Sequence, residues 1–382
     1  MRTWVNKMTE PKHTEHKHNA HQTHNKQNNT PVILAVLFII SLAVGTYLIF
    51  GTGTDLVKSG EPAELTLTIV GADCEDCFDI TPAIQVLQTE YTFKEIKNVS
   101  MDDSGSLVAK YDITKLPAMI FTGDIEEIQL PNLVKKDDAM VFTETPAPYY
   151  DVSKKEIVGY VTITRLVDSS CHGCFNISII EDQMTGAGIL VKSRETVEVS
   201  SEKGKQLVSK YKITEVPTLL FNKELLVYEQ IQQVWKDFGS EESDGTLVLR
   251  TLNPPYKNIQ TGKIEGIVNL KYLVDKTCMN CFEPSNYYDL LKESFSLTVN
   301  DEKIIDVSTT DGKNLIKKYN ITQIPTVILS PEAGVYPSLK TAWPQVGSEE
   351  RDGNFIFRNV DLLDSYLSSK GKQLVYKNIT SE

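Results

Sequence analysis

The sequence lacks solitary cysteines. Its 382 residues contain six cysteines in three pairs, and in each pair two residues separate the partners. A secreted fold that is stabilised by disulfides distributes its cysteines so that the bonds close long loops. Because these pairs close almost no loop, the spacing argues against a disulfide-stapled framework and indicates a chemical role. The pairs are Cys74 and Cys77, Cys171 and Cys174, and Cys278 and Cys281.

An excess of basic residues is also missing from most of the chain. Residues 1–30 carry five Lys/Arg and two Asp/Glu, which leaves 34 basic and 49 acidic residues in the rest, a net charge of −15. Proteins that bind nucleic acids need clustered Lys and Arg to neutralise phosphates. We therefore expect no nucleic-acid partner, and we assign the acidic balance to solubility.

Charge is absent from one segment, residues 31–50. Twenty apolar residues at 1.5 Å rise per residue span a hydrocarbon layer of about 30 Å. The apolar part of a cleavable signal peptide is shorter, about 7–15 residues, and ends in small residues. This segment ends in Tyr47, Leu48, Ile49 and Phe50 instead. It predicts a retained transmembrane signal anchor and a single-pass membrane protein.

The flanks of this segment predict its orientation. The five basic residues of 1–30 precede it, whereas Lys58 follows among several acidic residues. Cytosolic flanks carry the Lys/Arg excess, so we expect a cytosolic N-terminus and extracytoplasmic domains, where disulfides persist. Residues 1–30 also contain five of the six histidines. We predict a disordered, His-rich tail, and a weak metal-binding tract remains the alternative.

The remainder of the chain repeats three times. Each CxxC pair is followed by a phenylalanine, in CEDCFDIT, CHGCFNIS and CMNCFEPS. A second block recurs as LVAKYDITKLPAMIF, LVSKYKITEVPTLLF and LIKKYNITQIPTVIL, and its proline lies 43, 46 and 47 residues after the first cysteine. The prolines are Pro117, Pro217 and Pro325. Repeats of this kind predict three tandem domains, at 63–150, 155–254 and 263–382, with boundaries in the Pro-rich stretches 145–154 and 253–263.

Each repeat predicts the same order of elements. Alternating, β-branched segments at 64–70, 159–167 and 266–274 favour strands that run directly into a CxxC pair. Apolar residues at helical spacing follow, then a second strand ending near Val99, Val199 or Val307, a short helix, and a strand after the proline. This is a small mixed α/β unit. Trp235 and Trp343, in a segment shared by the last two repeats, are predicted core aromatics.

A CxxC pair at this place can carry out thiol chemistry. We expect the first cysteine to open a helix, whose N-terminus favours a thiolate. The second cysteine then lies one turn later, within reach of the first, so that the pair can form and open a disulfide. A cis X–Pro bond in the second block would leave the preceding backbone free to pair with an extended substrate.

At these residues the chain resembles the thioredoxin superfamily over roughly 63–382, three times. Tandem domains on a membrane-anchored chain resemble protein disulfide isomerases. The resemblance implies a thiol–disulfide oxidoreductase without a cofactor, acting on cysteine-containing clients together with a membrane or soluble redox partner. It implies Cys74, Cys171 and Cys278 as nucleophiles, Cys77, Cys174 and Cys281 as resolving thiols, and Pro117, Pro217 and Pro325 as substrate-binding cis-prolines.

The chain departs from the family at several places, and alternatives remain. None of the CxxC dipeptides is Gly-Pro, Gly-His or Pro-His, and Arg165 and Tyr272 stand at the offset of the family's buried acid, so the redox direction stays open. One alternative is a non-enzymatic client-binding or adhesion protein made of redox-silent modules. Another is zinc, although zinc ribbons space their CxxC pairs by about 15–20 residues rather than a hundred.

The neighbours of the first cysteines predict a ranking of the sites. Beside Cys171, His172 would favour a thiolate when protonated, and we expect it to modulate this site. Asp73, Glu75 and Asp76 around Cys74 would disfavour one. We therefore expect the second pair to be the most oxidising and the first the most reducing.

Overall fold

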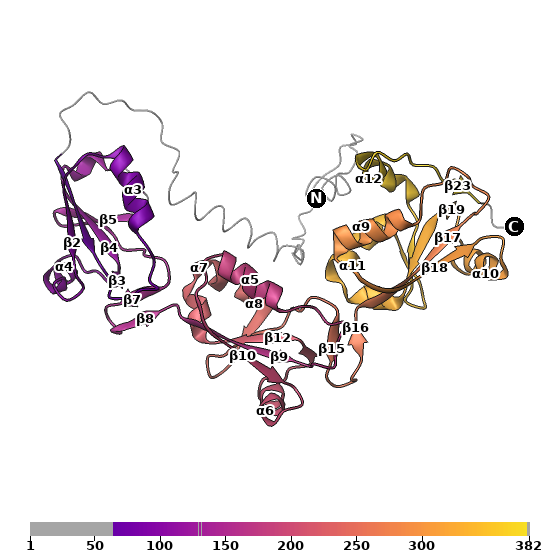
Figure 1. Cartoon of the computed structure of the whole chain (residues 1–382), viewed down its shortest axis with the longest axis horizontal. Coiled ribbons are helices and arrows are strands. Elements are labelled where there is room, and N and C mark those ends of the chain that lie inside the picture. The colour runs from indigo at the N-terminus through magenta and orange to yellow at the C-terminus, as the bar shows by residue number, and fades with distance from the viewer. Residues whose placement is uncertain (1–63, 129, 131, 380–382) are drawn as a thin grey trace, which may run out of the picture.

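The computed structural model describes residues 64–128, 130 and 132–379 (Figure 1). The predicted tail at 1–30 and membrane anchor at 31–50 lie outside these residues. No helix in the described part of the chain is long and apolar enough to cross a membrane. Figure 1 shows three mixed α/β units that follow one another along the chain, as the three repeats predict.

The first unit contains a five-stranded sheet in the order β2-β1-β4-β6-β5. Strands β1 and β2 are parallel and joined by helix α3, whereas β4 runs antiparallel to β1. The short helix α4 leads from β2 to the two-residue strand β3, which precedes β4. The bounds are β1 Leu65–Val70, α3 Thr81–Glu90, β2 Phe93–Val99, α4 Gly105–Lys110, β3 Lys115–Leu116, β4 Ala118–Gly123, η1 Ile125–Glu127, β5 Leu133–Lys136 and β6 Ala139–Phe142.

The second unit repeats this sheet in the order β10-β9-β12-β14-β13. Its first two strands are again parallel, and β12 runs antiparallel to β9. The bounds are β9 Val161–Val167, α5 Ser178–Gly186, β10 Val191–Glu198, α6 Glu202–Tyr211, β11 Glu215–Val216, β12 Thr218–Phe221, η2 Lys223–Val227, α7 Glu229–Gln232, α8 Trp235–Phe238, β13 Gly239–Glu241 and β14 Leu247–Leu249.

The third unit has the strand order β18-β17-β20-β22-β21. It adds a helix after the last sheet strand and is otherwise built like the second unit. The bounds are β17 Ile267–Val274, α9 Ser285–Phe295, β18 Thr298–Asp306, α10 Thr310–Tyr319, β19 Gln323–Ile324, β20 Thr326–Leu329, η3 Pro331–Val335, α11 Pro337–Val346, β21 Gly347–Glu349, β22 Phe355–Phe357, η4 Val360–Leu363 and α12 Asp364–Ser369.

The order β-α-β-α-β-β, with a parallel first pair and an antiparallel third strand, resembles the thioredoxin-like domain that the repeats predict. The predicted strands and the helices before each proline are confirmed. Apolar residues fill both faces of each sheet, because its strands carry buried side chains in succession; β12, for example, is buried throughout. Trp235 and Trp343 are core residues, as expected.

Short hairpins lie between the units. Strands β7 (Tyr149–Asp151) and β8 (Glu156–Val158) pair with each other, and β7 pairs with β3 of the first unit. Strands β15 (Tyr256–Asn258) and β16 (Ile264–Glu265) do the same with β11. The Pro-rich stretches 145–154 and 253–263, where we expect the boundaries, thus overlap hairpins that pair with the preceding unit, and this strand pairing extends the first two units to β8 and β16.

Candidate functional site

Each CxxC pair lies in the loop between the first strand of a unit and its first helix. The two cysteines of each pair are joined by a disulfide, with Cα atoms 5.4, 5.4 and 5.5 Å apart in chain order. All six cysteines are half-buried rather than enclosed in the core. Disulfides at these positions in thioredoxin-like domains suggest a redox function.

The cysteines do not open the helices, so this part of the prediction is wrong. Helices α3, α5 and α9 begin at Thr81, Ser178 and Ser285, seven residues after the first cysteine of each pair. The thiols therefore lie outside the first helical turn, where the partial positive charge of a helix acts. A helix dipole does not explain a reactive thiolate at these sites.

A distant hydrogen bond and a local turn delay the first helix. The backbone N–H of Phe78 donates to the carbonyl oxygen of Pro148, 2.7 Å away, instead of to a helical partner four residues earlier. The N–H of Thr81 donates to the Asp79 carboxylate at 2.8 Å, which is the local turn that Asp favours over a helix interior. Because these bonds hold the backbone before Thr81 outside the helical hydrogen-bond pattern, α3 begins only at Thr81.

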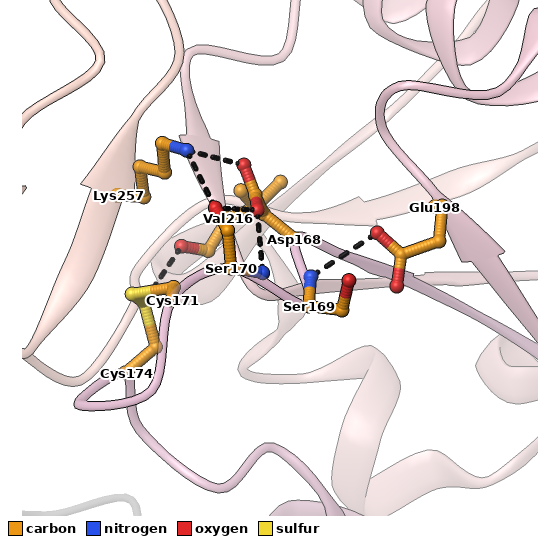
Figure 2. Close-up of a disulfide and its surroundings, with 8 residues drawn as sticks. All are labelled: Asp168, Ser169, Ser170, Cys171, Cys174, Glu198, Val216 and Lys257. Carbon is orange, nitrogen blue, oxygen red and sulfur yellow. Dashed lines mark hydrogen bonds and ion pairs between the residues drawn. A yellow bond between two sulfur atoms is a disulfide. The ribbon is translucent and has the colours of Figure 1, made fainter.

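The proline of each second block follows a cis peptide bond, and in the second unit this bond lies next to the cysteine pair. The peptide bonds before Pro117, Pro217 and Pro325 are cis, as the resemblance implies. In the second unit the Cys174 sulfur lies 3.8 Å from the carbonyl oxygen of Val216, the residue before the cis-proline (Figure 2). The fold thus brings together the two blocks that the sequence separates by more than 40 residues.

The backbone before each cis-proline is not free, contrary to the expectation of an open edge. Each of these edges pairs antiparallel with a short strand from later in the same unit. We call β7, β15 and β23 (Lys377–Asn378) the strap strands. The pairings are Leu116 with Tyr150 and Lys115 with Asp151, Val216 with Lys257 and Glu215 with Asn258, and Ile324 with Lys377 and Gln323 with Asn378.

A residue one or two positions before each strap strand also binds the loop that follows the resolving cysteine, and we call this residue and its strap strand together the strap. Phe175 N–H donates to Pro255 O at 2.7 Å, and Phe282 N–H donates to Val375 O at 3.1 Å, as Phe78 does in the first unit. In all three units the strap therefore runs from the cysteine loop to the pre-proline edge in one register. The position where an extended client would add a strand is filled by the chain itself.

An ion pair fastens the strap in two units. Lys257 Nζ lies 2.6 Å from an Asp168 carboxylate oxygen and 3.1 Å from Ser170 Oγ (Figure 2). The hydrogen bond from Lys257 is the largest cause that holds the pKa of Asp168 below its ordinary value. Lys377 likewise pairs with Asp275 at 2.5 Å and lowers the pKa of that carboxyl to about 2.

Both members of this pair are missing from the first unit. Gly71 lies three residues before Cys74, where Asp168 and Asp275 lie relative to their cysteines. Tyr150 takes the place of the lysine opposite the pre-proline residue. The lysine and the aspartate are thus present together or absent together, which supports a shared role.

The position of the family's buried acid is occupied differently in each unit. Arg165 on β9 forms an ion pair with Glu181 on α5, whose side chain is 1% exposed. Tyr272 on β17 donates to Glu302 at 2.5 Å, and its burial raises its pKa above the ordinary value. In the first unit, Thr68 stands there. The second unit therefore contains a buried carboxylate, Glu181, that the sequence did not reveal.

The three CxxC sites differ in the residues that lie beside them. His172, the predicted modulating residue, is exposed. Asp76 and Cys74 of the first site contact residues of the second unit. A Cβ at Gly173 of the second site would lie 3.1 Å from Ile267 of the third unit. Met279, between the cysteines of the third site, is 93% exposed.

Comparisons with known proteins add little to this geometry. No family model matches the sequence, and no curated protein does. Among solved structures, ERdj5 form II is 12% identical over 72% of this chain, with a TM-score of 0.15. The NTD_N/C domain of the alkyl hydroperoxide reductase AhpF from Enterococcus faecalis is 15% identical over 49% of this chain and 89% of its own, with a TM-score of 0.14.

A third similar structure is human ERp44 in a zinc-bound form, which is 10% identical over 73% of this chain and 83% of its own, with a TM-score of 0.14. The chain spans only 38% of the length of the ERdj5 chain it matches. At these TM-scores none of the likenesses supports an inference. The assignment of a thioredoxin-like arrangement depends on the strand order and connections described above.

Proposed function

We propose that the protein is a membrane-tethered thiol–disulfide oxidoreductase or isomerase that acts on cysteine-containing proteins outside the cytosol. The observation that carries this proposal is the recurrence, three times, of a half-buried CxxC disulfide in the loop before the first helix, in a unit with a cis-proline. Buried structural thiols are inert, whereas partly exposed ones can exchange.

The exchange involves only a CxxC pair, a client disulfide and a dithiol partner that reduces the pair again. In the reduced form, the thiolate of Cys74, Cys171 or Cys278 attacks one sulfur of a client disulfide, forms a mixed disulfide and releases a client thiolate. The resolving thiolate of Cys77, Cys174 or Cys281 then attacks the mixed disulfide, which closes the CxxC disulfide and releases the second client thiolate. Two electrons pass from the pair to the client, and a dithiol partner returns the pair to its reduced form.

The tether and the location rest on the sequence. The uncharged segment 31–50 and its basic N-terminal flank support a single-pass anchor with a cytosolic N-terminus. Protease added to intact cells is expected to remove the three units and leave a membrane-bound stub. Protection of the units in intact cells, with cleavage in inside-out vesicles, would contradict this orientation.

A second candidate is a redox-silent protein that binds or adheres to clients. The straps favour it, because they fill the pre-proline edges that an extended client would use. A site whose strap never leaves could keep its disulfide without exchanging it. The two candidates therefore differ in whether the disulfides turn over.

Insulin reduction by dithiothreitol, with and without the full chain, tests the proposal. The protein should accelerate the reaction, and replacing Cys74, Cys171 and Cys278 together by Ser should abolish the acceleration. As the matched control, Ser at Cys77, Cys174 and Cys281 should stop turnover but trap mixed disulfides with insulin. Equal activity of the parent and the first triple variant would favour the redox-silent candidate.

A further inference from the structure

The first CxxC site is the only one of the three sites, within the described residues, at which a neighbouring unit places a hydrogen-bonding group on a sulfur. The hydroxyl oxygen of Tyr160, from the second unit, lies 3.8 Å from Cys74 Sγ. The same hydroxyl lies 3.3 Å from a carboxylate oxygen of Asp76. In this disulfide form the hydroxyl donates to the carboxylate, and the sulfur is a second acceptor within its reach.

A lysine of the second unit completes the cluster. Lys192 Nζ lies 2.7 Å from the Asp76 carboxylate and 4.6 Å from the centroid of the Tyr160 ring. The ammonium neutralises Asp76, one of the three carboxylates that flank the cysteines of this site, and leaves Asp73 and Glu75 exposed to solvent. The ammonium weakens Asp76 as an acceptor, so that a thiolate at Cys74 can compete for the phenolic hydrogen.

The position of Tyr160 is fixed from both sides. It follows β8 by two residues, and β8 belongs to the hairpin that pairs with the first unit. Its carbonyl oxygen accepts a hydrogen bond from Asn222 Nδ2 at 2.9 Å, and the N–H of Gly159 donates to Glu224 at 2.8 Å. The strap hairpin and the second unit thus hold the phenol over Cys74.

The second site has a different neighbour at the matching position. Ile267 begins the third unit as Tyr160 begins the second, and it approaches Gly173, which lies between the cysteines. An aliphatic side chain excludes water but donates no hydrogen bond. The hydroxyl is therefore a specific feature of the first site rather than a general consequence of joining the units.

We propose that Tyr160 is a catalytic residue of the first site, whose hydroxyl donates a hydrogen bond to the Cys74 thiolate, and that Lys192 is a positioning residue that weakens Asp76 as the competing acceptor. The inference rests on the proposed thiol chemistry. A hydrogen bond to the charged form of a group favours that form. The second unit thereby offsets part of the effect that the carboxylates around Cys74 have on its thiolate.

The pKa of the Cys74 thiol tests this proposal in the full chain. With Cys77 replaced by Ser and the other two pairs left oxidised, Cys74 is the free thiol, and mass spectrometry follows its alkylation by iodoacetamide against pH. Tyr160→Phe should raise the midpoint and slow alkylation at pH 7 by about three- to tenfold, while the plateau at high pH stays unchanged. Tyr150→Phe, on the strap of the same unit, is the matched control and should keep the parent midpoint.

Substitutions of Lys192 distinguish a positioning role of this lysine from a general structural effect. Lys192→Met should move the midpoint in the same direction, and Lys192→Arg should restore it. An unchanged midpoint in Tyr160→Phe, or a changed plateau alone, would overturn the proposal, because either result means that the phenol affects access and not charge. The midpoint needs no client, so a parent that fails to reduce insulin but shows the Tyr160 effect refutes the proposed function and not this hydrogen bond.

Discussion

Replacing Lys257 by Met should loosen the strap of the second unit without removing its backbone pairing. Lys257 belongs to β15, opposite Val216, and its ammonium binds Asp168, three residues before Cys171. Methionine keeps most of the aliphatic stem and removes only the charged group. The substitution therefore tests whether the ion pair holds the strap over the cysteine loop.

The expected magnitude follows from the exposure of the pair. The side chains of Lys257 and Asp168 are 23% and 16% exposed, so solvent screens them less than a surface pair. Exposed pairs contribute about 0.2–1 kcal/mol, and the added bond to Ser170 Oγ places this one at about 1 kcal/mol. A loss of that size should increase local opening of the strap about fivefold.

Amide hydrogen exchange measures this opening. The reporters are the amide of Ile259, which donates to Thr214 O at 2.8 Å, and the amide of Phe175, which donates to Pro255 O. Both should exchange about fivefold faster in Lys257→Met. Lys263→Met, near the same hairpin, is the matched control and should leave both rates unchanged. Unchanged exchange in Lys257→Met would refute the role of the ion pair.

The effect should also depend on pH. Lys257 holds the pKa of Asp168 below its ordinary value of 3.8. A carboxyl whose folded pKa is depressed stabilises the fold above its unfolded pKa, and this stability is lost as the pH falls through the folded pKa. The parent and Lys257→Met should therefore differ at neutral pH and converge as the pH falls below 3.8. A difference that persists once Asp168 is protonated would contradict this explanation.

Two further substitutions test the fold around the sites. Gly204→Ala should destabilise the second unit by about 1–3 kcal/mol in a urea titration, because its Cβ would lie 2.0 Å from the backbone oxygen of Glu198. The control is Gly105→Ala, whose Cβ meets nothing within 4 Å and which should be neutral or slightly stabilising. An equal loss of unfolding free energy in both variants would contradict the role of this contact. Arg165→Met should cost about 1–3 kcal/mol, because it removes one of the two arginine partners of the buried Glu181 carboxylate and leaves Arg194 as the other, and a loss under about 1 kcal/mol would show that Glu181 does not depend on this arginine.

Local patterns in the sequence were sufficient for most of the fold. Alternation and β-branching predict β1, β9 and β17, and the resemblance at the repeated blocks implies the cis peptide bonds before Pro117 and its counterparts. These features depend on residues close in sequence or on the recurrence of a block. The same is true of Trp235, which lies in a segment shared by the last two repeats and is buried as expected.

The straps could not be predicted in this way. The stretch from Pro148 to Gly159 repeats from Pro255 to Gly266, and turn residues in it indicate a boundary between domains. Strap strands of two or three residues show no alternation, and their partners lie more than 30 residues earlier. The delayed start of α3 is missed for the same reason, since it depends on the bond from Phe78 to Pro148.

The charged residues around Cys74 show a second limit of prediction from the sequence. The sequence places Asp73, Glu75 and Asp76 beside this cysteine, and their number alone predicts a disfavoured thiolate. The structure brings Lys192 and Tyr160 to the same place from 84 or more residues away. Neighbours in sequence therefore misrepresent the electrostatics of a site that two units share.

The reduction potentials of the three pairs test the central claim most directly. The full chain can be equilibrated in dithiothreitol or glutathione buffers, its free thiols trapped by alkylation, and each pair quantified by mass spectrometry. If the pairs exchange with clients, their midpoints should fall between about −120 and −270 mV, the range of thiol–disulfide oxidoreductases. Midpoints below about −300 mV at all three pairs are typical of structural disulfides and would contradict the claim.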